Sequence, residues 1–541
     1  MCQLDERGQI LELKFPQLAL GDFITAAARR WPNENCFVSP LGDSSDITNV
    51  RLQSFARTDE RVTKLARSLI DLGFERGDRV AILAVDSIEH METILACAKA
   101  GITYCDLNFR LRAPELQNIL TRSQVRGIFF NERYLPILNE MEGEIPEVSH
   151  WWQYDGEGRN FERLIAATST SQELSAQARG EDILSIMFTS GTTSIPKGVL
   201  QSERMMRNIV YSFNREIRLN PGGLQYSGAS LFHISGIGSV LHALYAGRAS
   251  LLLPQFDDVA VLAWLQRGGI NSCTLIPTMI SAILELPGAT DHTYDDLDSI
   301  LYGGAAMTPA LLRRMMTTFD CDFYNGLGAG TEAGIQTILT PEDHRAAIAG
   351  NEALFSSIGQ AIRGVDLRLC DEDLNDVERG EVGEIVTRSE TIMSGYLDQP
   401  ELTSRSIVDG WFRAGDMAWM DEEGYLFLAT RKSDMIIRGG ENVYPVEIES
   451  TLADYPGVLE VAVVGCDDEH WGELVVAAVK LRDGISVTQD ELKAHCRAKL
   501  ASYKVPEHVL FFDFLPKNAT NKLIKSEIKL MVNQVLNGKT S

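Results

Sequence analysis

Residues 77–106 read GDRVAILAVDSIEHMETILACAKAGITYCD, and this stretch decides the fold. An apolar run at 80–85 resembles a strand, and residues 88–100 then show the apolar spacing of a helix. Gly101 ends that helix and a second strand-like run follows at 102–106. A strand, a helix and a strand in this order predict two parallel strands with the helix packed across them.

The same alternation recurs over much of the chain, at 128–140, 183–213, 228–245 and 249–267. It predicts an α/β fold in which helices cover parallel strands. Residues 154–181 are polar and lack apolar periodicity, so we expect a surface connection there.

The pattern changes near residue 364. Strand-like segments then follow in quick succession, at 365–369, 383–386 and 425–428. They predict a small β-rich subdomain, about 364–430, at the end of a large N-terminal domain, 1–430. Residues 431–541 predict a smaller α+β C-terminal domain, with alternating segments at 458–464 and 474–480 and helical segments at 446–454 and 489–500.

Composition narrows the class of protein. The 541 residues exceed what one core usually holds, and the net charge of −25 argues against nucleic acid or an anionic membrane as a main partner. The nine cysteines contain no CxxC pair and are odd in number, which indicates buried thiols in a reducing compartment. Because no secretory leader and no eighteen-residue apolar run stand out, we expect a cytoplasmic protein without a membrane span.

A second stretch, TSGTTSIPKG at 189–198, follows the apolar run 183–188. Glycines let backbone N–H groups approach an anion, hydroxyls donate further hydrogen bonds, and Lys197 adds a positive charge. This is not a Walker A loop, because Pro196 and Gly198 flank the lysine where that motif needs Gly and Ser or Thr. We interpret the stretch as a polyphosphate-binding loop; an ordinary exposed turn is the alternative.

This loop resembles the phosphate loop of the adenylate-forming superfamily, which comprises acyl- and aryl-CoA synthetases, adenylation domains of peptide synthetases and beetle luciferases. The family usually has Gly where this chain has Ser194. Further motifs in the family's order extend the resemblance over about the whole chain. The resemblance implies that the phosphates of ATP are bound by Thr189, Ser190, Gly191, Thr192, Thr193 and Lys197.

Two motifs in the middle of the chain resemble the family's acyl and adenine sites. An aromatic–His pair lines the acyl pocket in the family and corresponds here to Phe232 and His233, although a lone buried His is more often a core residue. In the family, the segment at the end of the strand-like run near residue 302 borders the adenine and the acyl group. A tight strand-to-helix turn is the alternative interpretation. Its implied contacts are Gly303 for the substrate and Gly304, Ala305 and Ala306 for the nucleotide.

Residues 325–332, NGLGAGTE, depart most from the family. The family pattern is an aromatic that stacks on adenine, Gly, a variable residue, Thr for phosphate and Glu for Mg²⁺. Thr331 and Glu332 match, Leu327 stands where we expect the aromatic, and the spacing is one residue longer. The nucleotide-binding residues implied in between are Gly328, Ala329 and Gly330. Restoring an aromatic at 327 or deleting Gly330 is expected to raise pyrophosphate release.

The last motifs imply a mobile C-terminal domain. Asp416 and Arg431 match the ribose-contacting pair, and Ser433 falls at the family's hinge, where Asp or Lys is usual. Gly439 and Gly440 match the loop that enters the active site after domain rotation and forms the pantetheine tunnel; an ordinary hairpin turn is the alternative. Lys522 matches the lysine that bridges the carboxylate and the α-phosphate.

These resemblances imply an AMP-forming acyl-CoA ligase that uses ATP, Mg²⁺ and coenzyme A to activate a hydrophobic carboxylic acid. Three alternatives stay open. The enzyme could convert only a pre-made acyl-adenylate that a separate adenylating enzyme supplies, because the departures fall on nucleotide handling. It could load a carrier protein, or it could be a non-catalytic nucleotide- or acyl-binding protein.

The acid itself is open. The chain also resembles acyl-CoA ligases of bacterial diterpenoid-antibiotic biosynthesis, such as the platensimycin and platencin pathways, and this implies a bulky polycyclic acid. A medium or long fatty acid, an aryl acid or a steroid side-chain acid fits equally well.

Overall fold

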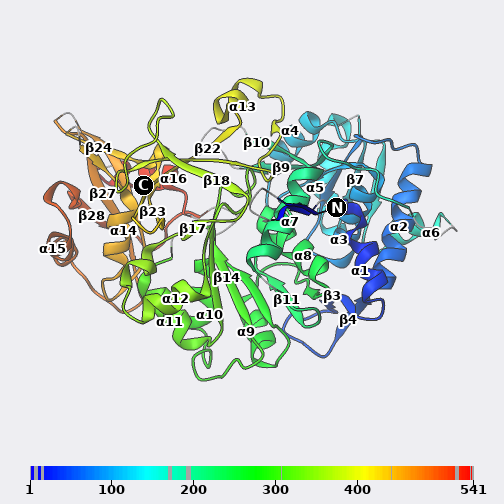
Figure 1. Cartoon of the computed structure of the whole chain (residues 1–541), viewed down its shortest axis with the longest axis horizontal. Helices are drawn as coiled ribbons and strands as arrows, with labels where there is room; N and C mark the ends of the chain where they lie inside the picture. Colours follow the sequence, from blue (N-terminus) through cyan, green and yellow to red (C-terminus); the bar gives the residue numbers. More distant parts are fainter. Residues whose placement is uncertain are drawn as a thin grey trace.

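The computed structural model shows a mixed α/β protein with a large N-terminal domain and a smaller C-terminal domain (Figure 1). The residues that it describes are 2–4, 10–13, 18–145, 147–168, 174–189, 196–217, 219–305, 307–439, 441–468, 470–517, 523–536 and 538.

The unit predicted at 77–106 is confirmed. Strand β5 (Arg79–Leu83), helix α3 (Ile88–Ala100) and strand β6 (Thr103–Asp106) follow one another, and the two strands are parallel. Ser87 caps α3 by accepting a hydrogen bond from the backbone of His90. Gly101 ends the helix with φ 78°, a left-handed conformation that glycine adopts without strain.

These strands belong to a seven-stranded sheet with the order β20-β10-β9-β6-β5-β7-β8. One expected connection was wrong. Residues 183–213 were expected to continue the parallel alternation, but β9 (Ile183–Thr189) and β10 (Lys197–Ser202) are antiparallel neighbours. Only seven residues separate the two strands, which is fewer than the dozen or more that connect a parallel pair. The other members are β7 (Gly127–Phe130), β8 (His150–Gln153) and β20 (Gly395–Tyr396).

A nine-stranded sheet has the order β17-β16-β15-β14-β13-β11-β12-β3-β4. Its central strands are parallel and its outer pairs are antiparallel. The strands are β3 (Asn35–Pro40), β4 (Val50–Ser54), β11 (Leu224–Ser227), β12 (Ala249–Leu251), β13 (Ser272–Leu275), β14 (Ser299–Gly303), β15 (Asp322–Leu327), β16 (Thr337–Leu339) and β17 (Gln360–Ala361).

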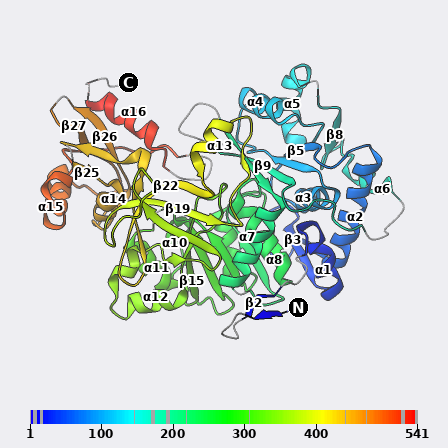
Figure 2. The same cartoon turned by 45° about the horizontal axis from the view of Figure 1, so that its top comes forward.

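Helices α7 (Glu203–Glu216) and α8 (Ile234–Ala246) lie in the layer between the two sheets, in the centre of Figures 1 and 2. The largest apolar core surrounds them and includes Ile82 of one sheet and Leu301 of the other. Because both faces of these helices pack against buried side chains, close packing fixes their positions relative to the two sheets.

The region 154–181 is more ordered than expected. It contains helix α6 (Phe161–Ala166), whose Phe161 and Ile165 are buried in the main core. Two apolar side chains separated by four positions are a weak helical signal. Because the residues around them are polar, the sequence pattern did not predict this helix.

The strands expected near residue 364 are confirmed as one antiparallel sheet. Its members are β18 (Val365–Cys370), β19 (Gly383–Ser389), β21 (Ile407–Val408), β22 (Trp411–Met420) and β23 (Leu426–Arg431). A small apolar core that includes Ile385 and Leu426 covers one face of this sheet.

The C-terminal segments form their own five-stranded sheet with separate apolar cores, and they lie beside the β-rich sheet (Figure 1). A hydrogen bond of 2.9 Å from Arg482 to Glu285 joins them to α10 (Pro277–Glu285). Their elements are β24 (Ile436–Arg438), β25 (Glu441–Val443), α14 (Pro445–Ala453), β26 (Val458–Asp468), β27 (Gly472–Leu481), α15 (Gln489–Lys499), β28 (His508–Phe511) and α16 (Lys525–Leu536).

The remaining elements cover sheet faces and edges. They are β1 (Cys2–Leu4), β2 (Ile10–Leu13), α1 (Phe23–Arg30), α2 (Phe55–Asp71), α4 (Ala113–Ser123), α5 (Leu135–Met141), α9 (Asp258–Gln266), α11 (Pro309–Thr318), α12 (Pro341–Ile348) and α13 (Pro400–Ser406). Within the described ranges, no helix combines the length and the apolar character that a bilayer crossing requires. Cys36 to Cys496 are free thiols there, and all but Cys321 are buried, as expected.

Candidate active site

The stems of the expected phosphate loop stand side by side. Thr189 is the last residue of β9, Lys197 is the first of β10, and the two are partners across the antiparallel pair. Arg122 supports this end of the loop by donating a 2.8 Å hydrogen bond to the carbonyl oxygen of Pro196. The loop's central candidates, Ser190, Gly191, Thr192, Thr193 and Ser194, lie outside the described residues.

Lys197, Tyr396 and Glu332 form a row of polar groups at this point. Strand β20 pairs with β10 and thereby brings Tyr396 next to the start of β10. The amino group of Lys197 lies 5.6 Å from the centroid of the Tyr396 ring, which is within cation–π range. The Tyr396 hydroxyl donates a 3.3 Å hydrogen bond to Oε1 of Glu332. Sequence analysis missed Tyr396, because a single tyrosine in a short strand carries no motif.

The backbone of Thr331 and Glu332 is held from two sides. The side-chain amide of Gln201 on β10 donates a 2.9 Å hydrogen bond to the carbonyl oxygen of Thr331. The backbone N–H of Met393 donates to the carbonyl oxygen of Glu332 at 2.8 Å. The two candidate residues are therefore fixed beside β10 although the loop before them departs from the family spacing.

Burial raises the pKa of the Glu332 carboxyl, and the positive charges of Lys197 and Arg431 act in the opposite direction. A carboxylate removed from water gains most from a nearby cation. Among the described residues, no group of three or more His, Cys, Asp or Glu side chains gathers into a metal cage. Mg²⁺ commonly takes one or two carboxylates plus substrate phosphates, so Glu332 fits as its single protein carboxylate.

The glycine-rich loop before Thr331 closes tightly on itself. A Cβ at position 328 would lie 1.8 Å from the carbonyl oxygen of Gly334, so only glycine fits there. Gly330 has φ 55° and its carbonyl oxygen accepts a 2.8 Å hydrogen bond from Gly334. The loop thus accommodates its unusual length as a compact turn.

Leu327 contacts a neighbouring apolar core. Its side chain packs into the core of the β-rich sheet, against residues such as Ile385 and Leu426. Leu327 itself has no aromatic ring that could stack on a nucleotide. Since position 328 accepts no side chain, neither position supplies the family's adenine stack.

Asp416 and Arg431 are brought together as expected. They are partners across β22 and β23, and the Arg431 Nε lies 3.0 Å from Oδ1 of Asp416. The Asp416 side chain is only 7% exposed, whereas that of Arg431 is 58% exposed. The guanidinium therefore reaches toward solvent from an anchored carboxylate, an arrangement that suits a pair of adjacent hydroxyls.

Phe232 and His233 lie in the turn that leads into α8, and His233 is its N-cap residue. Phe232 is buried and meets Phe109 edge to face, with 5.4 Å between ring centroids. Asp86 fixes this turn by accepting a 3.0 Å hydrogen bond from the backbone of Leu231. Burial raises the pKa of Asp86 to about 7, and sequence analysis had no pattern that could identify it.

Gly303, Gly304 and Ala305 continue from the carboxyl end of β14. A Cβ on Gly303 would lie 2.2 Å from the carbonyl oxygen of Gly326, so the two strand ends approach closely. Gly304 has φ 77° and is exposed, as is Ala305. Ala306 lies outside the described residues.

Two of the C-terminal candidates, Ser433 and Gly439, lie within the described residues. Ser433 is exposed in a short 3-10 turn after β23, and Gly439 is exposed in the turn between β24 and β25, against Trp471. The alternative reading of this motif, a hairpin turn, thus describes its local structure. Gly440 and Lys522 lie outside the described residues.

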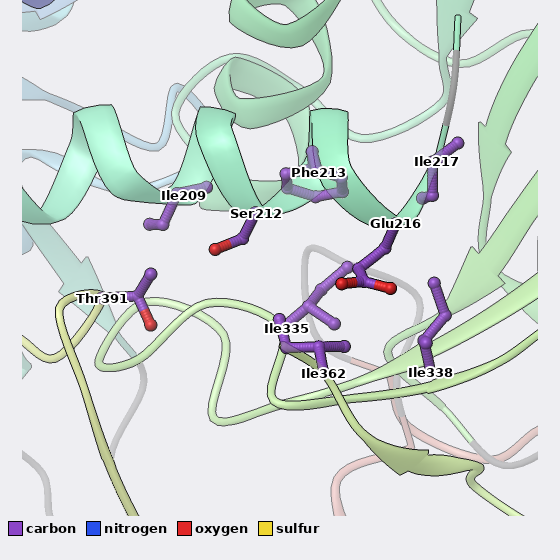
Figure 3. Close-up of a pocket in the computed structure, with 9 residues that line it drawn as sticks. All are labelled: Ile209, Ser212, Phe213, Glu216, Ile217, Ile335, Ile338, Ile362 and Thr391. Carbon is purple, nitrogen blue, oxygen red and sulfur yellow. The ribbon is translucent and has the colours of Figure 1, made fainter. Parts of the chain in front are cut away.

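An apolar pocket lies next to the Glu332 segment. Figure 3 shows Ile335, Ile338 and Ile362 opposite the Ile209 and Phe213 side chains of α7. Ile335 follows Glu332 by three positions, and the pocket lies between α7 and side chains on and next to strands β16 and β17.

Comparison with known proteins gives a consistent result. A family model described as AMP-binding enzyme matches residues 24–397, and one described as AMP-binding enzyme C-terminal domain matches residues 447–522.

Two curated relatives and one solved structure are similar over nearly the whole chain. Long-chain-fatty-acid–CoA ligase FadD13 of Mycobacterium tuberculosis is 31% identical, over 89% of this chain and 93% of its own. Fatty acid–[acyl-carrier-protein] ligase ScoC of Streptomyces coeruleorubidus is 30% identical, over 88% of this chain and 91% of its own. The anthranilate CoA ligase AuaEII, solved with anthranoyl-AMP, is 26% identical with a TM-score of 0.86, covering 97% of this chain and 99% of its own.

Proposed function

The chain belongs to the AMP-binding enzyme family and is an AMP-forming acid–thiol ligase; on that premise we propose that it makes an acyl-CoA thioester from a hydrophobic carboxylic acid. The observation that carries the proposal is the row Lys197–Tyr396–Glu332 at the mouth of the phosphate loop. A cation, a hydroxyl and a carboxylate beside the ends of β9 and β10 support triphosphate binding there.

In the first half-reaction, the substrate carboxylate attacks the α-phosphorus of ATP and pyrophosphate leaves. Thr189, Lys197 and the loop hydroxyls would bind the phosphates, and Asp416 with Arg431 would bind the ribose. Mg²⁺ held by Glu332 would neutralise charge on the departing pyrophosphate. Lys522 would neutralise charge at the reacting centre, and removing one such preorganised donor typically costs about 10²–10³-fold in rate.

In the second half-reaction, the thiolate of coenzyme A attacks the acyl carbonyl and AMP leaves. The segment with Gly439 would have to move to the acyl group together with Gly440, the next residue in the sequence. We place the pivot at Ser433, between domains 1–430 and 431–541. An exposed, short turn at Ser433 supports this pivot, because few contacts oppose a change in its backbone angles.

The thioesterification-only alternative draws support from residues 327 and 328, which leave adenine without an aromatic partner. Losing such a stack costs about 1–3 kcal/mol, or about 5- to 150-fold in affinity. That loss weakens ATP binding but does not abolish it. The two backbone anchors of Thr331 and Glu332 favour a functioning first half-reaction, so the two-step ligase remains our proposal.

Loading of a carrier protein is a second candidate, because one relative is named a fatty acid–[acyl-carrier-protein] ligase. The named acids of relatives include long-chain fatty acids and, in solved complexes, anthranilate. For this chain we propose a hydrophobic acid, with the bulky polycyclic class included, because the pocket in Figure 3 is lined mostly by isoleucine and phenylalanine. A cytoplasmic location is part of the same proposal.

The test is product formation from a panel of fatty, aryl and polycyclic acids with ATP, Mg²⁺ and coenzyme A. We expect acyl-CoA and AMP in equal amounts with at least one acid. A Lys197→Ala variant should retain the fold and lose most of the AMP formation. Product only when a carrier protein replaces coenzyme A would contradict the proposal.

A further inference from the structure

One face of the nine-stranded sheet carries an unusual row of polar side chains beneath α8. Gln225 on β11 lies beside Ser272 on β13, which lies beside Ser299 on β14. All three are buried. Because side chains two residues apart share a face of a strand, Leu301 and then Gly303 stand above Ser299 on the same face.

Helix α8 closes this row from above. Ser239 donates a 3.0 Å hydrogen bond to the hydroxyl of Thr274 on β13, and His242 stacks on Phe213 with 5.7 Å between ring centroids. A cavity lies between these side chains and the polar row. Phe213 and Ile217 line both this cavity and the apolar pocket of Figure 3, so the two adjoin at the end of α7.

Two hydrogen-bond acceptors in the cavity lining lack partners. Among the described residues, nothing hydrogen-bonds to Nε2 of His242 or to Oε1 of Gln225, and these side chains belong to residues that are 2% and 5% exposed. A buried polar group without a partner costs about 1–3 kcal/mol, so two in one cavity call for an explanation.

The His242 ring is held in the neutral tautomer in which Nε2 can accept a hydrogen bond. Its other ring nitrogen donates to the carbonyl oxygen of Ile217, which leaves Nε2 with a lone pair in the neutral ring. Burial lowers the pKa of His242 to about 3, and the positive charge of Arg248 adds to this effect. Arg248 itself is engaged at 3.0 Å with both Ser272 and Asp298.

The distance of the cavity from Gly303, where the substrate carboxylate is expected to lie, follows from the positions of the lining residues on the strands. Ser299 precedes Gly303 by four residues on β14, which corresponds to about 13 Å along a strand. Gln225 lies two strands across the sheet from Ser299, which adds about 10 Å at right angles to the strand. A molecule whose carboxylate lies at Gly303 therefore needs a length of about 16 Å for its far end to reach Gln225 and His242.

We propose that His242 and Gln225 bind a hydroxyl group at the far end of the acid, so that the preferred substrate is a hydroxylated hydrophobic acid about 16 Å long. The inference rests on the proposed function. The hydroxyl donates to one of the two acceptors, and the hydroxyl-bearing end of the acid occupies this cavity beside Phe213, Ile217 and Leu301. A site built around a substrate hydroxyl discriminates strongly against the analogue without it.

The test uses non-hydrolysable acyl-sulfamoyl adenosines with straight chains of eight, ten and twelve carbons, each with and without a terminal hydroxyl. Dissociation constants are measured by calorimetry on the full-length protein. We expect the hydroxylated form to bind on the order of tenfold more tightly at the best-fitting length. Equal binding of both forms at every length would overturn the inference.

The variants His242→Phe and Gln225→Leu keep the volume and the stacking of each site. Both should abolish the hydroxyl preference, whereas Ser212→Ala, in the apolar pocket, should leave it unchanged. A preference that survives in both variants would also overturn the inference. Acyl-CoA formation from the plain fatty acids reports separately on the proposed function, because it needs no hydroxyl.

Discussion

The hydroxyl of Tyr396 donates a 3.3 Å hydrogen bond to the carboxylate of Glu332, and the two residues reach each other from different sheets. Tyr396 is on β20 of the seven-stranded sheet, and Glu332 follows β15 of the nine-stranded sheet. The bond therefore links the stem of the phosphate loop to the candidate Mg²⁺ ligand and orients its carboxylate.

Tyr396→Phe removes this hydrogen bond and keeps the ring beside Lys197. We expect pyrophosphate release to fall about tenfold, because the Glu332 carboxylate loses its orienting donor. Glu332→Gln should cost more, about 10²–10³-fold, since it removes the charge itself. Both variants should still convert a pre-made acyl-adenylate to acyl-CoA. If Tyr396→Phe impairs that second reaction equally, the hydrogen bond serves general stability instead.

The glycine loop offers a matched pair of variants. Gly328→Ala forces a Cβ against the Gly334 carbonyl, which displaces the backbone that leads into Thr331 and Glu332. A displacement of about 1 Å can lower the rate about a hundredfold, and we expect that loss in pyrophosphate release.

Gly330→Ala is the control, because a Cβ there meets no described atom within 4 Å and only the positive φ costs about 1 kcal/mol. Its activity should remain within several-fold of the wild type. Equal activity of the two variants would show that the loop does not position Glu332.

Gly439 tests the proposed hairpin movement. Gly439→Leu should leave pyrophosphate release near the wild-type level and lower acyl-CoA formation at least tenfold, because a side chain would obstruct the path of the thiol. Gly484→Leu is the control, because Gly484 lies in the same domain and a leucine there meets similar backbone strain. Both glycines have a positive φ, 60° for Gly439 and 76° for Gly484. Loss of both half-reactions in Gly439→Leu alone would argue against a specific effect on the thiol step.

Asp86 makes stability depend on pH. Burial raises its folded pKa from 3.8 to about 7, so the folded state binds the proton more tightly than the unfolded state does. The stabilisation that Asp86 gives to the folded state is fully present below the unfolded pKa of 3.8. It is lost as pH rises through the folded pKa of about 7, by up to about 1.4 kcal/mol per pH unit.

Asp86→Asn cannot titrate and still accepts the hydrogen bond from Leu231. In urea unfolding at pH 5 and pH 7.5, the variant should show a smaller fall in the free energy of unfolding than the wild type. Asp43→Asn, at an exposed carboxylate whose pKa is lowered, should not reduce that fall. An unchanged fall in Asp86→Asn would contradict the account.

Local patterns predicted much of this fold, whereas long-range pairings were not predictable. The unit at 77–106 is encoded in apolar spacing over thirty residues, and its elements appear where that spacing places them. Strands β9 and β10 are antiparallel neighbours, and the apolar spacing that predicted strands and helices did not identify β10 as a separate strand.

The same distinction holds for the site. Asp416 and Arg431 were identifiable from a compact motif, and a shared strand pair brings them together. Tyr396 was not identifiable, because its contact with Glu332 depends on β20 docking onto β10, far away in the chain. The contact of Leu327 with a neighbouring apolar core was not predictable either, because that core is assembled from segments distant in the chain.

The most direct test of the central claim is a split assay on the wild-type enzyme with one accepted acid. Pyrophosphate release with ATP is measured beside acyl-CoA formation from the pre-made acyl-adenylate and coenzyme A. We predict activity in both reactions, with the Lys197–Tyr396–Glu332 row required only for the first. Acyl-CoA formation without any pyrophosphate release would contradict the two-step account and would mean that another enzyme supplies the adenylate.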